Sequence, residues 1–144
     1  MKQDNRYKKL RVWQEGMLLV RTLRSDYNGS RQNGFLDQMQ QYAFGIPILI
    51  KEAYTQNSDI EYIQSLCAVI YICTKLSALL HSALGADIID QTYQRSQLLK
   101  IRKISKMINR LMRINHHRNI RIKKSQSLIF PYNTGKVYKG YAYA

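Results

Sequence analysis

The sequence predicts an all-α fold, an antiparallel up-down four-helix bundle with a kinked second helix and a basic, aromatic C-terminal tail. Apolar residues recur at helical spacing in four segments of about 20 to 28 residues, as in simple helix bundles. Short polar stretches separate these segments. The chain has 144 residues, 45% of them hydrophobic, so one domain can bury its own core. We expect the bundle over residues 1–118 and the tail over residues 119–144.

The first two helices are expected over about residues 7–26 and 35–54, with an Asn- and Gly-rich loop between them. The second segment contains Pro47. Proline removes one backbone hydrogen bond and bends a helix, but the apolar pattern continues on both sides of it. One bent helix is therefore favoured over two short ones.

The third helix has the clearest start, because Ser58 and Glu61 have the spacing of a capping box. Its residues are apolar almost all round, which predicts the most buried helix of the bundle. Gly85 is expected as the glycine that follows its C-terminus. The fourth helix should begin after a cap at Asp87 or Asp90 and end around His117.

The positive charge is concentrated in the C-terminal part of the chain. Residues 1–90 hold ten basic and nine acidic residues, whereas residues 91–144 hold thirteen basic residues and no acidic one. Such one-sided charge attracts polyanions, either nucleic acid or an anionic membrane surface. A purely solubilising surface is the alternative, although it would normally mix both signs.

The fourth helix separates its charges from its apolar side. With Ile101 at 0°, the apolar residues from Ile101 to Ile114 fall between about 220° and 20°. Six cations fall between about 100° and 200°: Arg95, Arg102, Lys103, Lys106, Arg110 and Arg113. One side can therefore pack on the bundle while the other meets phosphates. The candidate nucleic-acid-binding residues are Arg95, Arg102, Lys103, Lys106, Arg110, Arg113, Arg118, Arg121, Lys123 and Lys124. A solvated helix face is the competing interpretation, and membrane insertion is disfavoured because the core needs the apolar side.

The C-terminal tail interleaves tyrosines with lysines, a pattern that can stack bases and hold a nucleic-acid backbone. Disorder or docking onto a protein partner is an equally good interpretation. The candidate docking residues are Tyr132, Tyr138, Tyr141 and Tyr143.

No catalytic or metal-binding pattern is recognisable, so we expect neither catalysis nor a cofactor. The chain lacks a Gly-rich phosphate loop and the histidine motifs of zinc enzymes. His81 is isolated on an apolar helix, where a core or interface position is the common case. Cys67 and Cys73 point about 120° apart on a helix, so buried thiols are expected rather than a disulfide. With no signal peptide visible, a cytoplasmic location is the default.

Three short segments resemble the four-helix-bundle family that includes the 23S rRNA intervening-sequence proteins. Residues 10–14 (LRVWQ) are similar to its L-x-V-W-Q opening. Residues 45–53 (GIPILIKEA) resemble its S-I-P-x-N-I-A-E-G stretch, and residues 61–66 (EYIQSL) its E-F-I-x-x-L stretch. The chain departs from the pattern at Leu49, Lys51, Ala53 and Lys75.

The family also contains the accessory variability determinants (Avd) of diversity-generating retroelements, and the basic charge is closer to these members. The resemblance implies a homopentameric barrel that associates with a reverse transcriptase and its template RNA during cDNA synthesis. An intervening-sequence-type bundle that acts as an RNA-binding or protein-docking scaffold is the alternative. The expected partners are therefore RNA or DNA, a reverse transcriptase and further copies of the chain, and no membrane.

Overall fold

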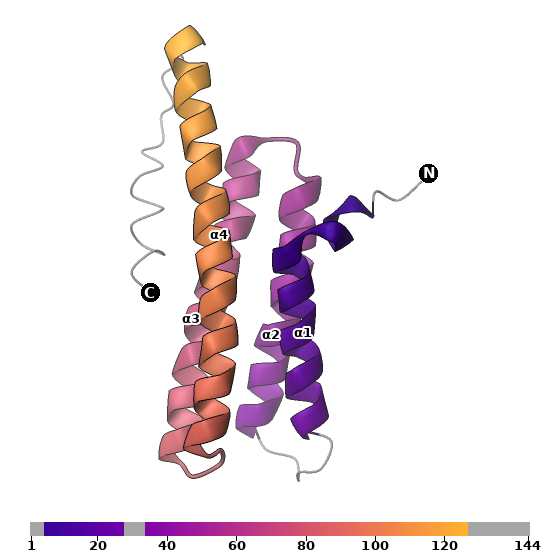
Figure 1. Ribbon diagram of the computed structural model, residues 1–144, viewed down its shortest axis with the longest axis vertical. Coiled ribbons are helices and arrows are strands. Elements are labelled where there is room, and N and C mark those ends of the chain that lie inside the picture. Colours follow the sequence, from indigo (N-terminus) through magenta and orange to yellow (C-terminus); the bar gives the residue numbers. More distant parts are fainter. Residues whose placement is uncertain (1–4, 28–33, 127–144) are drawn as a thin grey trace.

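In the computed structural model, residues 5–27 and 34–126 are described, with side chains described for residues 5–24 and 34–116. The described part contains one 3-10 helix, η1 (Arg6–Lys9), and four α-helices. These are α1 (Arg11–Tyr27), α2 (Gly34–Thr55), α3 (Asp59–Gly85) and α4 (Gln91–Gln126). Successive helices run in opposite directions, so the predicted all-α, up-down four-helix bundle is confirmed (Figure 1).

The N-terminal helix begins later than expected, because the chain turns at Leu10 between η1 and α1. The Tyr7 ring packs edge-on against Trp13, with ring centres 5.4 Å apart. The Gln14 side chain donates to the backbone carbonyl of Lys8 at 3.0 Å. These contacts hold η1 against the start of α1, and η1 points away from the bundle axis (Figure 1).

Pro47 lies inside one continuous α2, as the apolar pattern predicted. A glycine on the neighbouring helix gives this proline room: a Cβ on Gly16 would lie 3.1 Å from Ile46 Cγ2 and 3.7 Å from Pro47 Cδ. On another side of α2, a Cβ on Gly45 would lie 2.7 Å from Ile72 Cδ1 of α3. Glycine thus allows α1 and α3 to approach α2 closely.

Helix α3 supplies much of the core. The Ser58 side chain accepts a hydrogen bond from the Glu61 backbone N–H at 3.2 Å, which confirms the predicted N-cap. By length and composition α3 could span a membrane, but half of its most apolar window is buried inside the bundle. A buried core helix of a water-soluble bundle passes the same test.

The turn after α3 corrects the expectation for Gly85. That glycine is the last residue of α3, and the left-handed residue is Asp87, with φ 58°. The Asp87 N–H donates to the Leu84 carbonyl at 3.1 Å, and the Ile88 N–H to the Ala83 carbonyl at 2.9 Å. These are the two hydrogen bonds of a Schellman motif with Asp87 at its C′ position.

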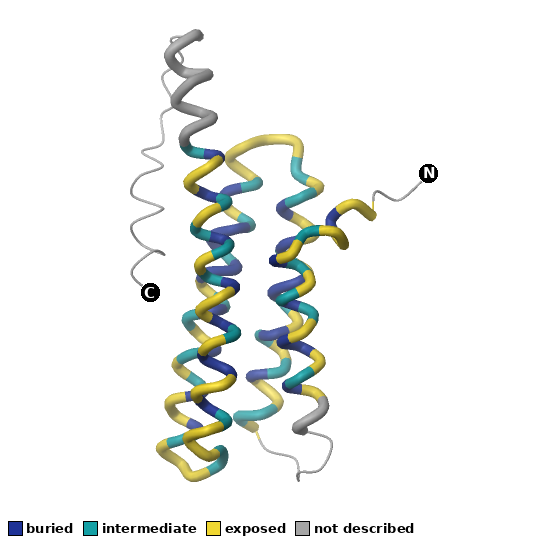
Figure 2. Tube along the Cα trace, in the orientation of Figure 1, coloured by how far each residue is buried: buried dark blue, intermediate teal, exposed yellow. Residues whose placement is uncertain are grey.

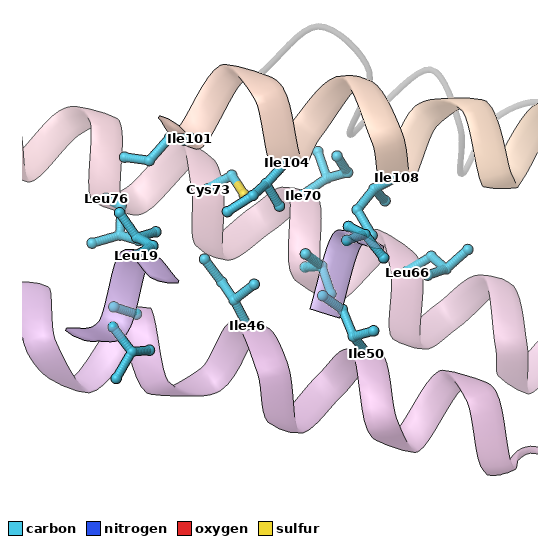
Figure 3. Close-up of a cluster of buried hydrophobic side chains, with 14 of the residues drawn as sticks. Leu19, Ile46, Ile50, Leu66, Ile70, Cys73, Leu76, Ile101, Ile104 and Ile108 are labelled. Atoms are coloured by element: carbon cyan, nitrogen blue, oxygen red, sulfur yellow. The ribbon is translucent and has the colours of Figure 1, made fainter. Parts of the chain in front are cut away.

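The core runs along the centre of the bundle, and exposed residues cover its outside (Figure 2). Helices α2 and α3 make the most extensive contact, and α1 and α4 the least among neighbouring pairs. Every helix contributes buried side chains at the centre (Figure 3). The labelled ones are Leu19, Ile46, Ile50, Leu66, Ile70, Cys73, Leu76, Ile101, Ile104 and Ile108.

Candidate nucleic-acid interface

Asp90 fixes where α4 begins, because its Oδ1 accepts a 2.7 Å hydrogen bond from the Tyr93 backbone N–H. From there, apolar residues that recur at helical spacing place one side of α4 against the core. Its buried apolar residues are Leu98, Ile101, Ile104, Ile108 and Met112. Four of these five were assigned to the core from their angular positions, so the inner side of α4 is as the sequence predicted.

The outer side of α4 carries the cations, all of them exposed. They are Arg95, Arg102, Lys103, Lys106, Arg110 and Arg113. Between Arg95 and Arg113 the row covers about 27 Å of helix at 1.5 Å per residue. A row of this length can meet several successive phosphates of a nucleic acid.

Lys103 differs from the other five cations because it is paired. Its Nζ lies 2.7 Å from Glu15 Oε1 of α1, and its side chain is 46% exposed while that of Glu15 is 16% exposed. The sequence argument considered only acids near the cations along the chain, so it missed this partner from the first helix. Lys103 therefore links α4 to α1, and its charge is partly compensated.

The other five cations on the outer side of α4 have no such partner among the described residues. No carboxylate in the described part of the chain lies within 4.0 Å of their charged groups. In the sequence, the last acid before the row is Asp90. The outer side of α4 is therefore a surface of uncompensated positive charge, which we call the cationic row: Arg95, Arg102, Lys106, Arg110 and Arg113.

Two apolar side chains of α4 depart from the expected separation of its apolar and charged sides. Ile114 was placed on the apolar side, but it is 56% exposed and lines a cavity near the turn between α2 and α3. Leu99 was not singled out, yet it is 65% exposed, at an angle between those of the cations.

The remaining predicted site residues lie outside the described side chains or outside the described residues. Helix α4 continues to Gln126 instead of ending around His117, so residues 119–126, expected in the tail, are helical. The side chains of Arg118, Arg121, Lys123 and Lys124 lie outside the described side chains. Tyr132, Tyr138, Tyr141 and Tyr143 lie outside the described residues altogether.

The titratable groups of the core do not form a reactive centre. Burial raises the pKa of Cys73 to about 11 and also raises the pKa of Cys67, so both thiols stay protonated at neutral pH. His81 is not in the core: it is exposed on α3, and its Nδ1 lies 2.9 Å from Gln94 Nε2 of α4. Among the described residues, no three His, Cys, Asp or Glu side chains gather into a group that could hold a metal ion.

A crystal structure shares this fold. It is that of a protein with unknown function from the S23 ribosomal protein family of Bacteroides thetaiotaomicron VPI-5482, at a TM-score of 0.67 and 15% identity. The match covers 71% of this chain and 95% of that one. No protein-family model matches the chain, and no curated protein matches it either. The two proteins therefore share a four-helix-bundle fold.

Proposed function

We propose that the chain is a non-catalytic protein that binds the phosphate backbone of RNA or DNA along the outer side of α4. The observation that supports this most directly is the cationic row, five exposed cations without an acidic partner in the described part of the chain. Arginine predominates there, with four of the five positions. Its planar guanidinium can donate two parallel hydrogen bonds to one phosphate, which lysine cannot do.

The salt dependence of binding tests this proposal. Each phosphate contact releases counterions, so losing one contact lowers the slope of log K against log salt by about 0.7 for a single strand. Four cations of the row are changed together to glutamine: Arg102, Lys106, Arg110 and Arg113. We expect the slope to fall by about 3 and the helical content to stay unchanged.

A control variant with the same loss of charge separates the row from general attraction. It changes four exposed cations of η1 and α1 to glutamine: Lys9, Arg11, Arg21 and Arg24. The control should keep most of the slope, because its residues belong to η1 and α1 and not to the cationic row. An equal loss of slope in both variants, or none in the α4 variant, would refute the proposal.

The finer proposal is an Avd-like role, in which the protein joins a reverse transcriptase and its template RNA. It rests on the resemblance of three segments and on the strong basic charge, and the shared fold is compatible with it. Co-purification with the products of neighbouring genes, followed by light scattering, tests it. A complex that contains a reverse transcriptase and RNA supports the role, whereas a bare oligomer at low salt speaks against it.

Self-association belongs to the same proposal and has its own structural support. Phe44 and Ile48 lie one turn apart on the outer side of α2, and they are 44% and 59% exposed. Adjacent exposed apolar side chains are typical of an interface. We propose that they contribute to a homo-oligomer, with a pentamer favoured by the resemblance. Changing both to aspartate should lower the mass measured by light scattering.

The alternative function is a protein-docking scaffold unrelated to reverse transcription. The same exposed side chains of α2 would then meet another protein, and the cations would meet its acidic surface. In that case the double aspartate variant would lose its protein partner. The affinity for RNA would be low in both the unchanged protein and the variant.

A further inference from the structure

A cavity of about 230 Å³ lies where the end of α2, the start of α3 and the distal part of α4 meet. Tyr54 and Tyr62 line it from α2 and α3, and Leu111 and Ile114 from α4. Polar groups of the turn between α2 and α3 complete the lining, including Asp59. The cavity thus sets two tyrosine rings and aliphatic side chains beside a lining that is half polar, so it offers both flat apolar surfaces and hydrogen-bonding groups.

The acidic group of the cavity is held in place from α4. Asn115, which is 9% exposed, donates from Nδ2 to Asp59 Oδ1 at 3.3 Å. Asp59 is exposed, and among the described residues its carboxylate accepts this one side-chain hydrogen bond. Because a carboxylate can accept about four, capacity remains for a ligand. Burial raises the pKa of Tyr62 and the nearby charge of Asp59 raises it further, so the phenol keeps its proton.

The sign of this charge decides what the cavity can hold. Asp59 repels phosphate, so the cavity suits an uncharged group that offers hydrogen-bond donors. The cationic row is close by, because Ile114 lines the cavity and follows Arg110 by one helical turn. A strand held by Arg110 and Arg113 would therefore have its bases, rather than its phosphates, beside the cavity.

We infer that this cavity accepts one unpaired guanine base of a single strand whose backbone lies on the cationic row. The inference rests on the proposed function and specifies its ligand. Guanine offers two adjacent donors, N1–H and the 2-amino group, which match the two oxygens of Asp59. Uracil offers one donor that lies between two carbonyl groups. The oxygens of these carbonyls would face the carboxylate and be repelled by it. The tyrosine rings and Ile114 supply surfaces on which an unstacked base can lie.

The test compares short single strands that differ in one base. Fluorescence anisotropy measures the affinity of the full chain for an oligouridine and for the same strand with one central guanosine or one inosine, which lacks the 2-amino group. A carboxylate that accepts two hydrogen bonds predicts about tenfold tighter binding of the guanosine strand. The inosine strand should lie between the other two.

A pair of variants assigns that preference to the cavity. Asp59→Asn should reduce the guanosine preference to less than about twofold, because an amide presents one acceptor where the carboxylate presents two. It should leave the affinity for oligouridine unchanged or slightly higher. Glu52→Gln removes the same charge from an exposed residue of α2 outside the cavity lining, so it should retain the preference.

Three outcomes are distinguishable. If oligouridine binds and guanosine adds nothing, the inference is wrong and the proposed function stands. If no strand binds, the proposed function fails, and NMR then examines the cavity alone: guanosine monophosphate should shift the Asn115 side-chain amide more than uridine monophosphate does. Equal shifts from both nucleotides, or a guanosine preference that survives in Asp59→Asn, would overturn the inference. Circular dichroism checks that the variant is folded.

Discussion

Replacing Gly85 with alanine should stabilise the protein, although a glycine at the end of an apolar helix commonly occupies a position that only glycine tolerates. Gly85 is helical, its φ is not positive, and an added Cβ would have no atom within 4 Å apart from its chain neighbours and the nearby backbone of its own helix. A helical Gly→Ala change gains about 0.5–1 kcal/mol. The left-handed residue is Asp87. Asp87→Gly should stabilise the protein by about 0.5 kcal/mol, because glycine adopts left-handed backbone without strain. The gain is smaller than the strain removed, because glycine also has more conformational freedom in the unfolded chain.

Urea unfolding followed by circular dichroism measures both changes. In a thermal scan, each kcal/mol corresponds to about 3 °C in Tm for a domain of this size. Asp87→Ala serves as the control, because alanine lacks the tolerance of aspartate for left-handed backbone and should lose stability. If Gly85→Ala instead loses about 1 kcal/mol or more, Gly85 is the left-handed residue and the described end of α3 is wrong.

Three further predictions concern the core and the contact between α1 and α4. Ile104→Ala should destabilise the protein by about 2–5 kcal/mol in urea, because the side chain is 0% exposed. Burial raises the pKa of Cys73 from 9.0 to about 11, so the folded state holds this proton more tightly and stability should fall as pH rises from about 9 to about 11. Cys73→Ala should remove that part of the slope. A double-mutant cycle on Lys103 and Glu15 should give a coupling below about 1 kcal/mol, decreasing with salt.

Local sequence signals were sufficient to predict structural features that depend on residues a few positions apart. The Ser58 cap is an interaction between neighbours in sequence, and the spacing of S-x-x-E reveals it. The inner and outer sides of α4 follow from one angular period, so Ile104 and Ile108 could be assigned to the core without a structure. The single helix across Pro47 was predicted because the apolar pattern continues beyond it.

Features that depend on packing between helices could not be predicted from local sequence signals. Lys103 and Glu15 are 88 residues apart, and nothing local links them. Ile114 has the angle of a core residue, but the bundle leaves it exposed near the turn between α2 and α3. The end of α3 was misassigned because a glycine signals a helix end only to within a residue or two, and aspartate also tolerates left-handed backbone.

The angular separation of charge and core on α4 has a consequence for how such a protein can change over generations. Exposed residues without partners usually alter stability by no more than about 0.5 kcal/mol when substituted. Arg95, Arg102 and Lys106 can therefore be exchanged, gained or lost with little effect on folding, so the charge of the outer side can drift independently of the scaffold. Lys103 is the exception, because its contact with Glu15 ties a change of charge to the contact between α4 and α1.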